Sequence, residues 1–261
     1  MPDAFGHDIH SVTVGSGEPT VMLHCMLARH QAMLPLSKAL GWQATLLDLP
    51  GHGRSADWDG KSEYQSLTVE AARQSCNGPA HIIGHSFGAT AALRLAVESP
   101  ECVSRLTLIE PVFFAAAKGT AAFTAHMKAF RPFVAAMLMG DEARAAEIFN
   151  AQWSDSDWTA LSDRQKDYLI QRIHLVVAGG AAIEEDADGV TSAARLGALD
   201  VPVTLIRGGQ TQPVIKAIHD TLVARIPQAT DHVVEEAGHM IALTHVAQIA
   251  AIIRAADQET G

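Results

Sequence analysis

One serine stands where a nucleophile is expected, at the centre of the run Gly84-His85-Ser86-Phe87-Gly88. The apolar segment 81–83 precedes this run, and a strongly helix-forming segment, 89–98, follows it. A serine on a tight turn between a strand and a helix is lifted above the sheet edge, and flanking glycines let both elements approach. The same turn puts the Phe87 N–H at the helix N-terminus, where it can donate to a developing oxyanion. We predict that Ser86 is a nucleophile; the alternative is that the glycines only ease packing.

A base for this serine is offered by His239, in the run Ala237-Gly238-His239-Met240. Of the 13 histidines, it alone lies in a late Gly-His turn between a predicted strand and the terminal helix. Gly238 gives the chain freedom to point the imidazole back over the sheet. The alternative is a histidine of a surface loop. His85, beside the nucleophile, is expected to orient the turn or to line the pocket.

The elements that must position these groups are short apolar strands that alternate with longer helical segments from residue 20 onward. We predict the strands Ile9–Val14, Thr20–His24, Ala44–Asp48, Ala80–Gly84, Arg105–Glu110, Val203–Arg207 and Asp231–Glu235. This rhythm indicates an α/β fold with a mostly parallel sheet and helices on both faces. Between residues 111 and 197 no strand pattern is found, so we expect a core domain of residues 1–110 and 198–261 with a helical lid, 111–197, inserted.

Three motifs in this order resemble the α/β-hydrolase superfamily over nearly the whole chain. Besides the serine turn, residues 48–55 (Asp-Leu-Pro-Gly-His-Gly-Arg-Ser) resemble that family's loop after an early strand, and residues 237–240 resemble its histidine loop. The resemblance implies an α/β-hydrolase fold and a serine hydrolase of the esterase type. Such a mechanism needs neither a metal nor an organic cofactor.

The acid partner of the histidine departs from the commonest family pattern. In most relatives it follows the strand after the lid, but here that turn, residues 207–213, contains no carboxylate. Glu110 lies at the carboxyl end of the strand predicted beside the nucleophile strand, a position that some superfamily members use. Burying a carboxylate without a partner costs folding free energy, which favours a role for Glu110 in the active site. The alternative is a Ser-His dyad, with Glu110 bonded to the first turn of the lid.

The oxyanion hole and the pocket are assigned by position. Met26 is expected to supply the second backbone donor beside Phe87, although Cys25 stands where relatives carry glycine and positive φ is harder to adopt. Cys25 as a nucleophile is disfavoured, because it lacks the turn. We expect the substrate pocket to be lined by His24, Cys25, His85, Phe113, Phe114 and Met240.

Composition limits the classes of binding partner and the cellular compartment that we expect. The formal charge is −10, and the absence of Lys or Arg runs argues against nucleic acid and anionic membranes as partners. No apolar stretch is long enough to span a bilayer, and three cysteines without metal-ligand spacing fit a reducing, cytoplasmic location. The apolar face of the lid is compatible with a pocket wall and equally with a homodimer interface.

A small to medium, mostly apolar ester is therefore the expected substrate. Carbon–carbon bond hydrolases, thioesterases, lactonases and perhydrolases use the same serine and stay open as alternatives. A ligand-binding homologue that has lost its chemistry is the alternative of a different class, because function belongs to the site and not to the fold.

Overall fold

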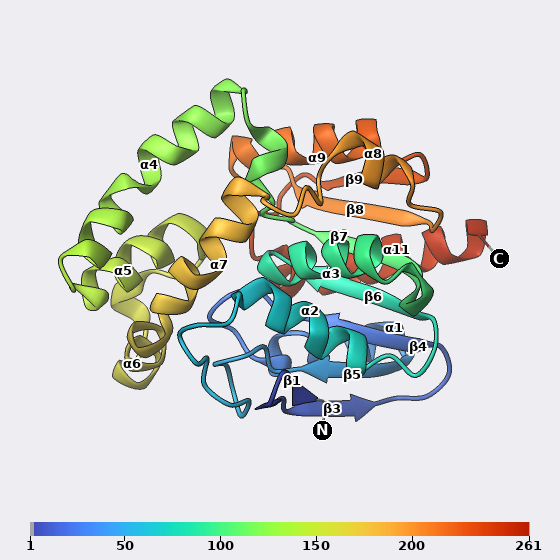
Figure 1. Ribbon diagram of the computed structural model, residues 1–261, viewed down its shortest axis with the longest axis horizontal. Coiled ribbons are helices and arrows are strands. Elements are labelled where there is room, and N and C mark those ends of the chain that lie inside the picture. Colours follow the sequence, from blue (N-terminus) through green and yellow to red (C-terminus); the bar gives the residue numbers. More distant parts are fainter. Residues whose placement is uncertain (1–2, 261) are drawn as a thin grey trace.

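A seven-stranded sheet forms the centre of the molecule in the computed structural model, which describes residues 3–260 (Figure 1). Its strands are β3 (Ser11–Val14), β4 (Pro19–Leu23), β5 (Gln43–Leu47), β6 (Ala80–His85), β7 (Val103–Ile109), β8 (Val203–Gly208) and β9 (Ala229–Val234). They lie in the order β3-β5-β4-β6-β7-β8-β9, and all neighbours pair in parallel except β3 with β5. Two short strands, β1 (Asp3–Ala4) and β2 (His7–Asp8), form a separate antiparallel pair. The predicted mostly parallel sheet is confirmed.

Helices cover both faces of this sheet. One face carries α1 (Leu34–Leu40), α10 (Ile241–Thr244) and α11 (Val246–Thr260). The other carries α2 (Tyr64–Gln74), α3 (Phe87–Glu98) and α9 (Pro213–Arg225). Within residues 3–260 none of the helices has both the length and the apolar character needed to cross a bilayer.

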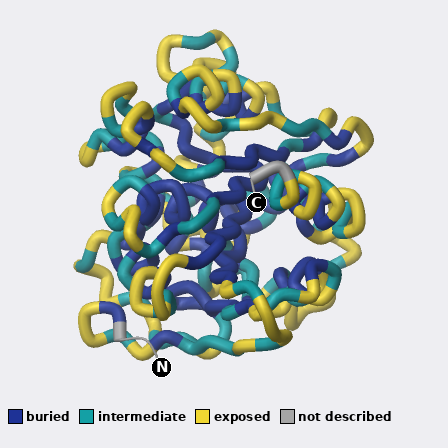
Figure 2. The backbone as a smooth tube through the Cα atoms, turned by 90° about the vertical axis from the view of Figure 1, so that its right-hand side faces the viewer, coloured by how far each residue is buried: buried dark blue, intermediate teal, exposed yellow. Residues whose placement is uncertain are grey.

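The alternation of strand side chains produces two separate cores. Successive strand residues point to opposite faces. Accordingly Ile82 and Leu108 pack with α2, α3 and α9, whereas their neighbours Ile83 and Ile109 pack with α1 and α11. Buried residues therefore follow the central strands, and exposed residues lie mostly in the outer helices and loops (Figure 2).

The chain between β7 and β8 contains only helices and connecting segments. It comprises η3 (Phe114–Ala117), α4 (Ala121–Leu138), α5 (Glu142–Trp153), η4 (Trp158–Ala160), α6 (Asp163–Arg172), α7 (His174–Glu185) and α8 (Ala193–Gly197). Helices α4 to α7 lie beyond the carboxyl ends of the parallel strands, at the left of Figure 1. Helix α8 instead packs on α9, beside the sheet. Within the expected lid, 111–197, the helices that overhang the strand ends are therefore α4 to α7.

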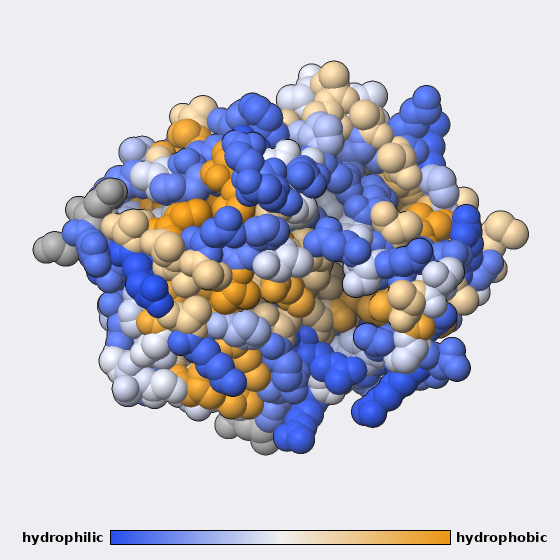
Figure 3. Space-filling model, turned by 180° about the vertical axis from the view of Figure 1, so that it is seen from behind, coloured by the Kyte–Doolittle hydropathy of each residue, from blue (hydrophilic) through white to orange (hydrophobic). Residues whose placement is uncertain are grey.

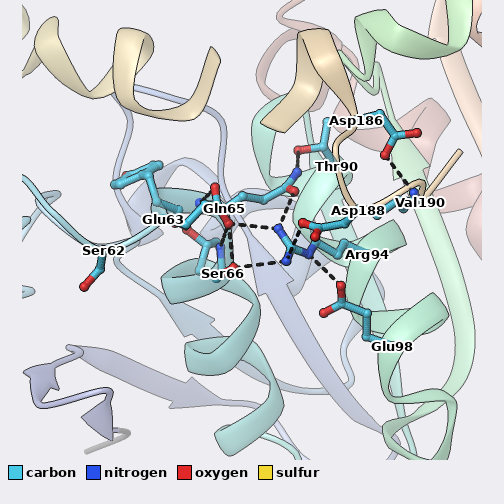
Figure 4. A network of polar contacts seen from close by, with 12 residues as sticks. Ser62, Glu63, Gln65, Ser66, Thr90, Arg94, Glu98, Asp186, Asp188 and Val190 are labelled. Atoms are coloured by element: carbon cyan, nitrogen blue, oxygen red, sulfur yellow. Dashed lines mark hydrogen bonds and ion pairs between the residues drawn. The ribbon is translucent and has the colours of Figure 1, made fainter. Parts of the chain in front are cut away.

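A cluster of charges fastens the return from this insertion to the core (Figure 4). The buried guanidinium of Arg94 on α3 pairs with Glu63, Glu98 and Asp188 at 2.9, 2.8 and 2.9 Å. Glu63 also caps α2 by accepting two backbone N–H bonds. Because Asp188 lies in the loop after α7, a single arginine connects α2, α3 and this loop.

Candidate active site

Ser86 lies on a strained turn between β6 and α3. Its backbone has φ 56° and ψ −118°, outside the conformations that serine ordinarily adopts. The two glycines of the motif make this turn fit. A Cβ on Gly84 would lie 2.4 Å from the Gly88 carbonyl oxygen, and a Cβ on Gly88 would lie 2.4 Å from that of Leu23. The motif therefore places Ser86 at the carboxyl edge of the sheet, as the sequence predicted.

A continuous chain of hydrogen bonds links Ser86 to a histidine and a carboxylate. His239 Nε2 lies 2.9 Å from Ser86 Oγ, and His239 Nδ1 lies 2.8 Å from Glu110 Oε2. Strands β6 and β7 are neighbours, so Glu110, which directly follows β7, ends beside Ser86. The loop after β9 carries His239 across the end of β8. The arrangement matches a nucleophile, a base and an orienting acid.

The Glu110 carboxylate is held by donors from the end of β8 and from the turn that follows it. Its Oε1 accepts the Gly208 N–H at 2.7 Å, and its Oε2 also accepts the Thr211 hydroxyl. Burial raises the pKa of Glu110, but His239, Thr211 and the Gly208 N–H together hold it below its ordinary value. In the sequence, residues 207–213 stood out only because they contain no carboxylate. In the structure they supply hydrogen-bond donors to the carboxylate of Glu110.

The loop after β4 carries the expected oxyanion donor without the strain anticipated at Cys25. The residue with positive φ in this loop is Leu27, at 62°, and Cys25 is not left-handed. Among the described residues, no protein acceptor binds the N–H of Met26 or of Phe87. Both residues border a cavity that Ser86 also lines. Burial raises the pKa of Cys25 to about 12, which leaves its thiol protonated.

Two buried histidines fix this loop to the loop at residues 48–52. His24 Nε2 accepts the Leu49 N–H at 3.0 Å, and its Nδ1 lies 2.7 Å from the Cys25 carbonyl oxygen. His52 Nε2 accepts the Leu27 N–H at 2.9 Å. Burial lowers the pKa of His24 to about 4 and that of His52 to about 3. Both rings are therefore neutral at pH 7, as an accepting nitrogen requires.

Two cavities meet at Ser86. The larger has a volume of about 130 Å³ and is lined by Met26, Ser86, Trp153, His239 and Met240, among others. The smaller, of about 50 Å³, also touches Ser86 and Trp153 but is otherwise lined mainly by aromatic and aliphatic side chains. The Trp153 ring lies 4.7 Å from that of His239. This residue of α5 is not among the six expected in the pocket from the sequence.

An outer groove continues the larger cavity toward solvent. The two share Leu27 and Leu169, and Arg29 and Arg164 line the groove. Seen from behind, the surface is hollowed between the core and the helices of the insertion (Figure 3). Of the two cavities at Ser86, the larger therefore opens toward the groove that Arg29 and Arg164 line.

Three of the six residues expected in the pocket line neither cavity. His24, His85 and Phe113 are fully buried. His24 supports the loop described above, Phe113 packs in the core, and His85 Nε2 donates to the His239 carbonyl oxygen at 2.9 Å. His85 thus positions the backbone of His239. Cys25, Phe114 and Met240 do border the cavities.

Gly238 serves a different purpose from the one expected. It does not have positive φ, but a Cβ there would lie 2.9 Å from the Asp155 carboxylate. Its small size leaves room for the insertion beside the histidine loop.

One group of described side chains has the composition of a metal site. The ligand atoms of His10, His30 and Asp48 all lie within 4.8 Å of one another. However, Asp48 Oδ1 already accepts the His30 N–H, and Oδ2 accepts the Arg54 N–H at 3.0 Å. The carboxylate is thus used to hold its own loop.

Comparisons with a family model and with curated proteins both match this chain to hydrolases. Residues 20–252 match the model of the alpha/beta hydrolase family. Over 249 residues the chain is 27% identical to lipase LipV of Mycobacterium tuberculosis, covering 87% of this chain and 85% of the lipase. It is also 27% identical, over 254 residues, to the pimeloyl-[acyl-carrier protein] methyl ester esterase of Yersinia pseudotuberculosis, covering 92% and 89%.

The fold has solved counterparts as well. An alpha/beta hydrolase from Sphaerobacter thermophilus superimposes with a TM-score of 0.73 at 19% identity, covering 97% of this chain and 99% of that one.

Proposed function

Because the chain belongs to the alpha/beta hydrolase family, we propose that it hydrolyses carboxylic esters through an acyl-enzyme on Ser86. The observation that carries the proposal is the hydrogen-bonded chain Ser86–His239–Glu110. A homologue that only binds ligands would not need this chain. The names of the relatives, a lipase and a methyl ester esterase, support ester hydrolysis but do not identify the substrate.

In the proposed mechanism His239 Nε2 accepts the Ser86 proton as Oγ attacks the acyl carbon. The Met26 and Phe87 N–H groups bind the oxyanion, helped by the dipole of α3. His239 then gives the proton to the leaving alkoxide, so an alcohol departs and an acyl ester stays on Ser86. Water, deprotonated by the same nitrogen, attacks that ester; His239 then returns the proton to the departing Ser86 Oγ, and the carboxylic acid is released. Glu110 keeps the proton of His239 on Nδ1 throughout.

The two cavities divide the substrate between them. The leaving oxygen must take its proton from His239 Nε2, so the alcohol lies on the His239 side. The larger cavity, lined by His239 and Met240, fits this part and opens toward the outer groove. The smaller cavity, against Phe87 and away from His239, fits the acyl group. Its aromatic wall favours an apolar acyl group over a sugar or a polyanion.

Activity-based labelling tests the proposal. A fluorophosphonate should label the folded protein at one site, and peptide mapping should place the adduct on Ser86. The Ser86→Ala variant should take no label and should hydrolyse p-nitrophenyl butyrate at the background rate. A folded wild-type protein with neither label nor turnover would instead indicate a ligand-binding homologue.

A further inference from the structure

The smaller cavity does not end at its own wall. Four of its lining residues, Phe130, Val176, Gly180 and Glu184, also line a larger groove on the surface of the insertion. The groove has a volume of about 720 Å³ and runs between α4 and α7. The cavity at Ser86 and the groove at the surface thus have a common border.

This border is built from one stripe of α7 and one side chain of α4. Val176, Gly180 and Glu184 are spaced by four residues, so they share one face of the helix. Phe130, stacked on Phe133 with ring centroids 4.5 Å apart, supplies the α4 side. Gly180 leaves the border open, because a Cβ there would meet only Glu184 Oε1, at 3.6 Å.

The neighbouring Gly179 has a different role, because it allows α7 to pack closely on the core. A Cβ at Gly179 would lie 2.7 Å from the Phe87 ring. Of the two adjacent glycines, only Gly180 therefore leaves space that a ligand could use.

Beyond the border the groove is exposed and mostly apolar, with His174 and Glu185 as its polar lining. Val134, Leu138 and Val177 line it with exposed fractions of 46, 84 and 53%, and Met139, 85% exposed, follows Leu138 in the chain. These four are most of the seven exposed large hydrophobic residues of the described chain. Such a concentration on a protein of charge −10 marks a surface that binds something apolar.

We infer that the groove between α4 and α7 is the outer part of the acyl site, and that a long acyl chain bound at Ser86 leaves the small cavity past Gly180 to lie in it. The cavity alone, at about 50 Å³, holds only a short acyl group. The continuity of lining residues with the Ser86 cavity selects an acyl chain as the occupant over a protein or a lipid surface. The inference rests on the proposed esterase function and names its substrate class: esters of medium to long linear carboxylic acids.

Glu184 is the one charged side chain at the border. Burial and the neighbouring Glu185 carboxylate raise its pKa, against the effect of Lys118. A carboxyl group with a raised pKa is more readily neutralised, so less free energy is needed to place it beside an apolar acyl chain.

The test compares p-nitrophenyl esters from acetate to decanoate, with the ratio of kcat/KM for decanoate to that for acetate as the readout. Half-burial of a methylene should raise kcat/KM about twofold, so the ratio should be on the order of one hundred in the wild-type protein. Gly180→Leu should lower the ratio at least tenfold by closing the border. Gly180→Ala is the matched control, because its methyl group fits, and it should keep the wild-type ratio.

A second pair of variants probes the exposed groove without touching the cavity. Val177→Asp puts a carboxylate where the chain would lie and should also lower the ratio at least tenfold. The same change at Val223, 37% exposed on α9 and outside the groove, should leave it unchanged. Equal ratios in all five proteins would overturn the inference while leaving the esterase proposal intact. Failure of the folded wild-type protein to hydrolyse even acetate would overturn the proposed function, on which the inference rests.

Discussion

Replacing Glu110 by glutamine should disable the base while preserving the shape of the site. The amide nitrogen of the new side chain must occupy one of two positions. At the Oε1 position it would face the Gly208 N–H, now 2.7 Å from the oxygen, and two fixed donors would oppose each other. At the Oε2 position it faces the Thr211 hydroxyl, which can rotate to accept, and His239 Nδ1, which can lose its proton. The second arrangement is therefore favoured.

The consequence for His239 is the wrong tautomer. With Nδ1 accepting from the amide, the ring proton moves to Nε2, which then donates to Ser86 and cannot remove its proton. The imidazolium formed in the transition state also loses its adjacent carboxylate. The corresponding change in Ser-His-Asp enzymes lowers kcat by about 10⁴. That factor is about 5.4 kcal/mol of transition-state stabilisation at ~1.36 kcal/mol per decade.

The assay is steady-state hydrolysis of p-nitrophenyl butyrate by wild-type protein, Glu110→Gln and Thr211→Val. Thr211→Val removes a donor from the same carboxylate oxygen but keeps the charge and the Nδ1 bond, so kcat should fall less than about tenfold. If Glu110→Gln retained activity within tenfold of wild type, or matched Thr211→Val, the acid role of Glu110 would be refuted in favour of a Ser-His dyad.

Three further expectations concern stability and reactivity. Arg94→Leu leaves three carboxylates without their cation and should lower the free energy of unfolding by about 2–4 kcal/mol in urea titrations. Arg73→Leu, in an exposed pair with Glu70, should lower it by clearly less, and equal losses would contradict the importance of the cluster. Burial lowers the pKa of His81 to about 3. Between pH 6.5 and about 3 the unfolded chain therefore binds a proton at this residue that the folded chain does not bind, so the free energy of unfolding decreases as the pH is lowered. In His81→Gln the free energy of unfolding should decrease less steeply between pH 6 and 4, by about 1.4 kcal/mol per pH unit. An unchanged slope would show that His81 is not held in the neutral form in the folded protein. Finally, iodoacetamide at pH 8 should not inactivate the folded protein through Cys25, whose thiol is protonated; rapid inactivation mapped to Cys25 by peptide analysis would contradict this.

Features fixed by local or nearest-neighbour rules could be predicted from the sequence. The turn at Ser86 needs only a strand, a helix and two glycines, all of which are adjacent in the chain. Glu110 could be placed beside it because the carboxyl ends of neighbouring parallel strands meet at one edge of the sheet. His239 required more, since its loop must cross the end of β8, but the late Gly-His turn was sufficient.

The walls of the site could not be predicted in the same way. Trp153 and Gly180 reach the cavities at Ser86 only because α5 and α7 pack at particular angles over the strand ends, and helical periodicity does not contain those angles. His24 and His85 were expected in the pocket because they adjoin site residues in sequence. They turn instead toward backbone groups, which buried imidazoles need as partners. Thr211 was missed because a hydroxyl that holds a carboxylate has no motif of its own.

The most direct test of the account is to trap the acyl-enzyme. Wild-type protein is mixed with excess p-nitrophenyl butyrate, quenched in acid within the first turnovers, and measured by intact mass and peptide mapping. We expect one butyryl group on the peptide that carries Ser86, together with a burst of p-nitrophenol close to the enzyme concentration. Turnover that persists in Ser86→Ala, with no acyl group on Ser86 in the wild-type protein, would contradict the account.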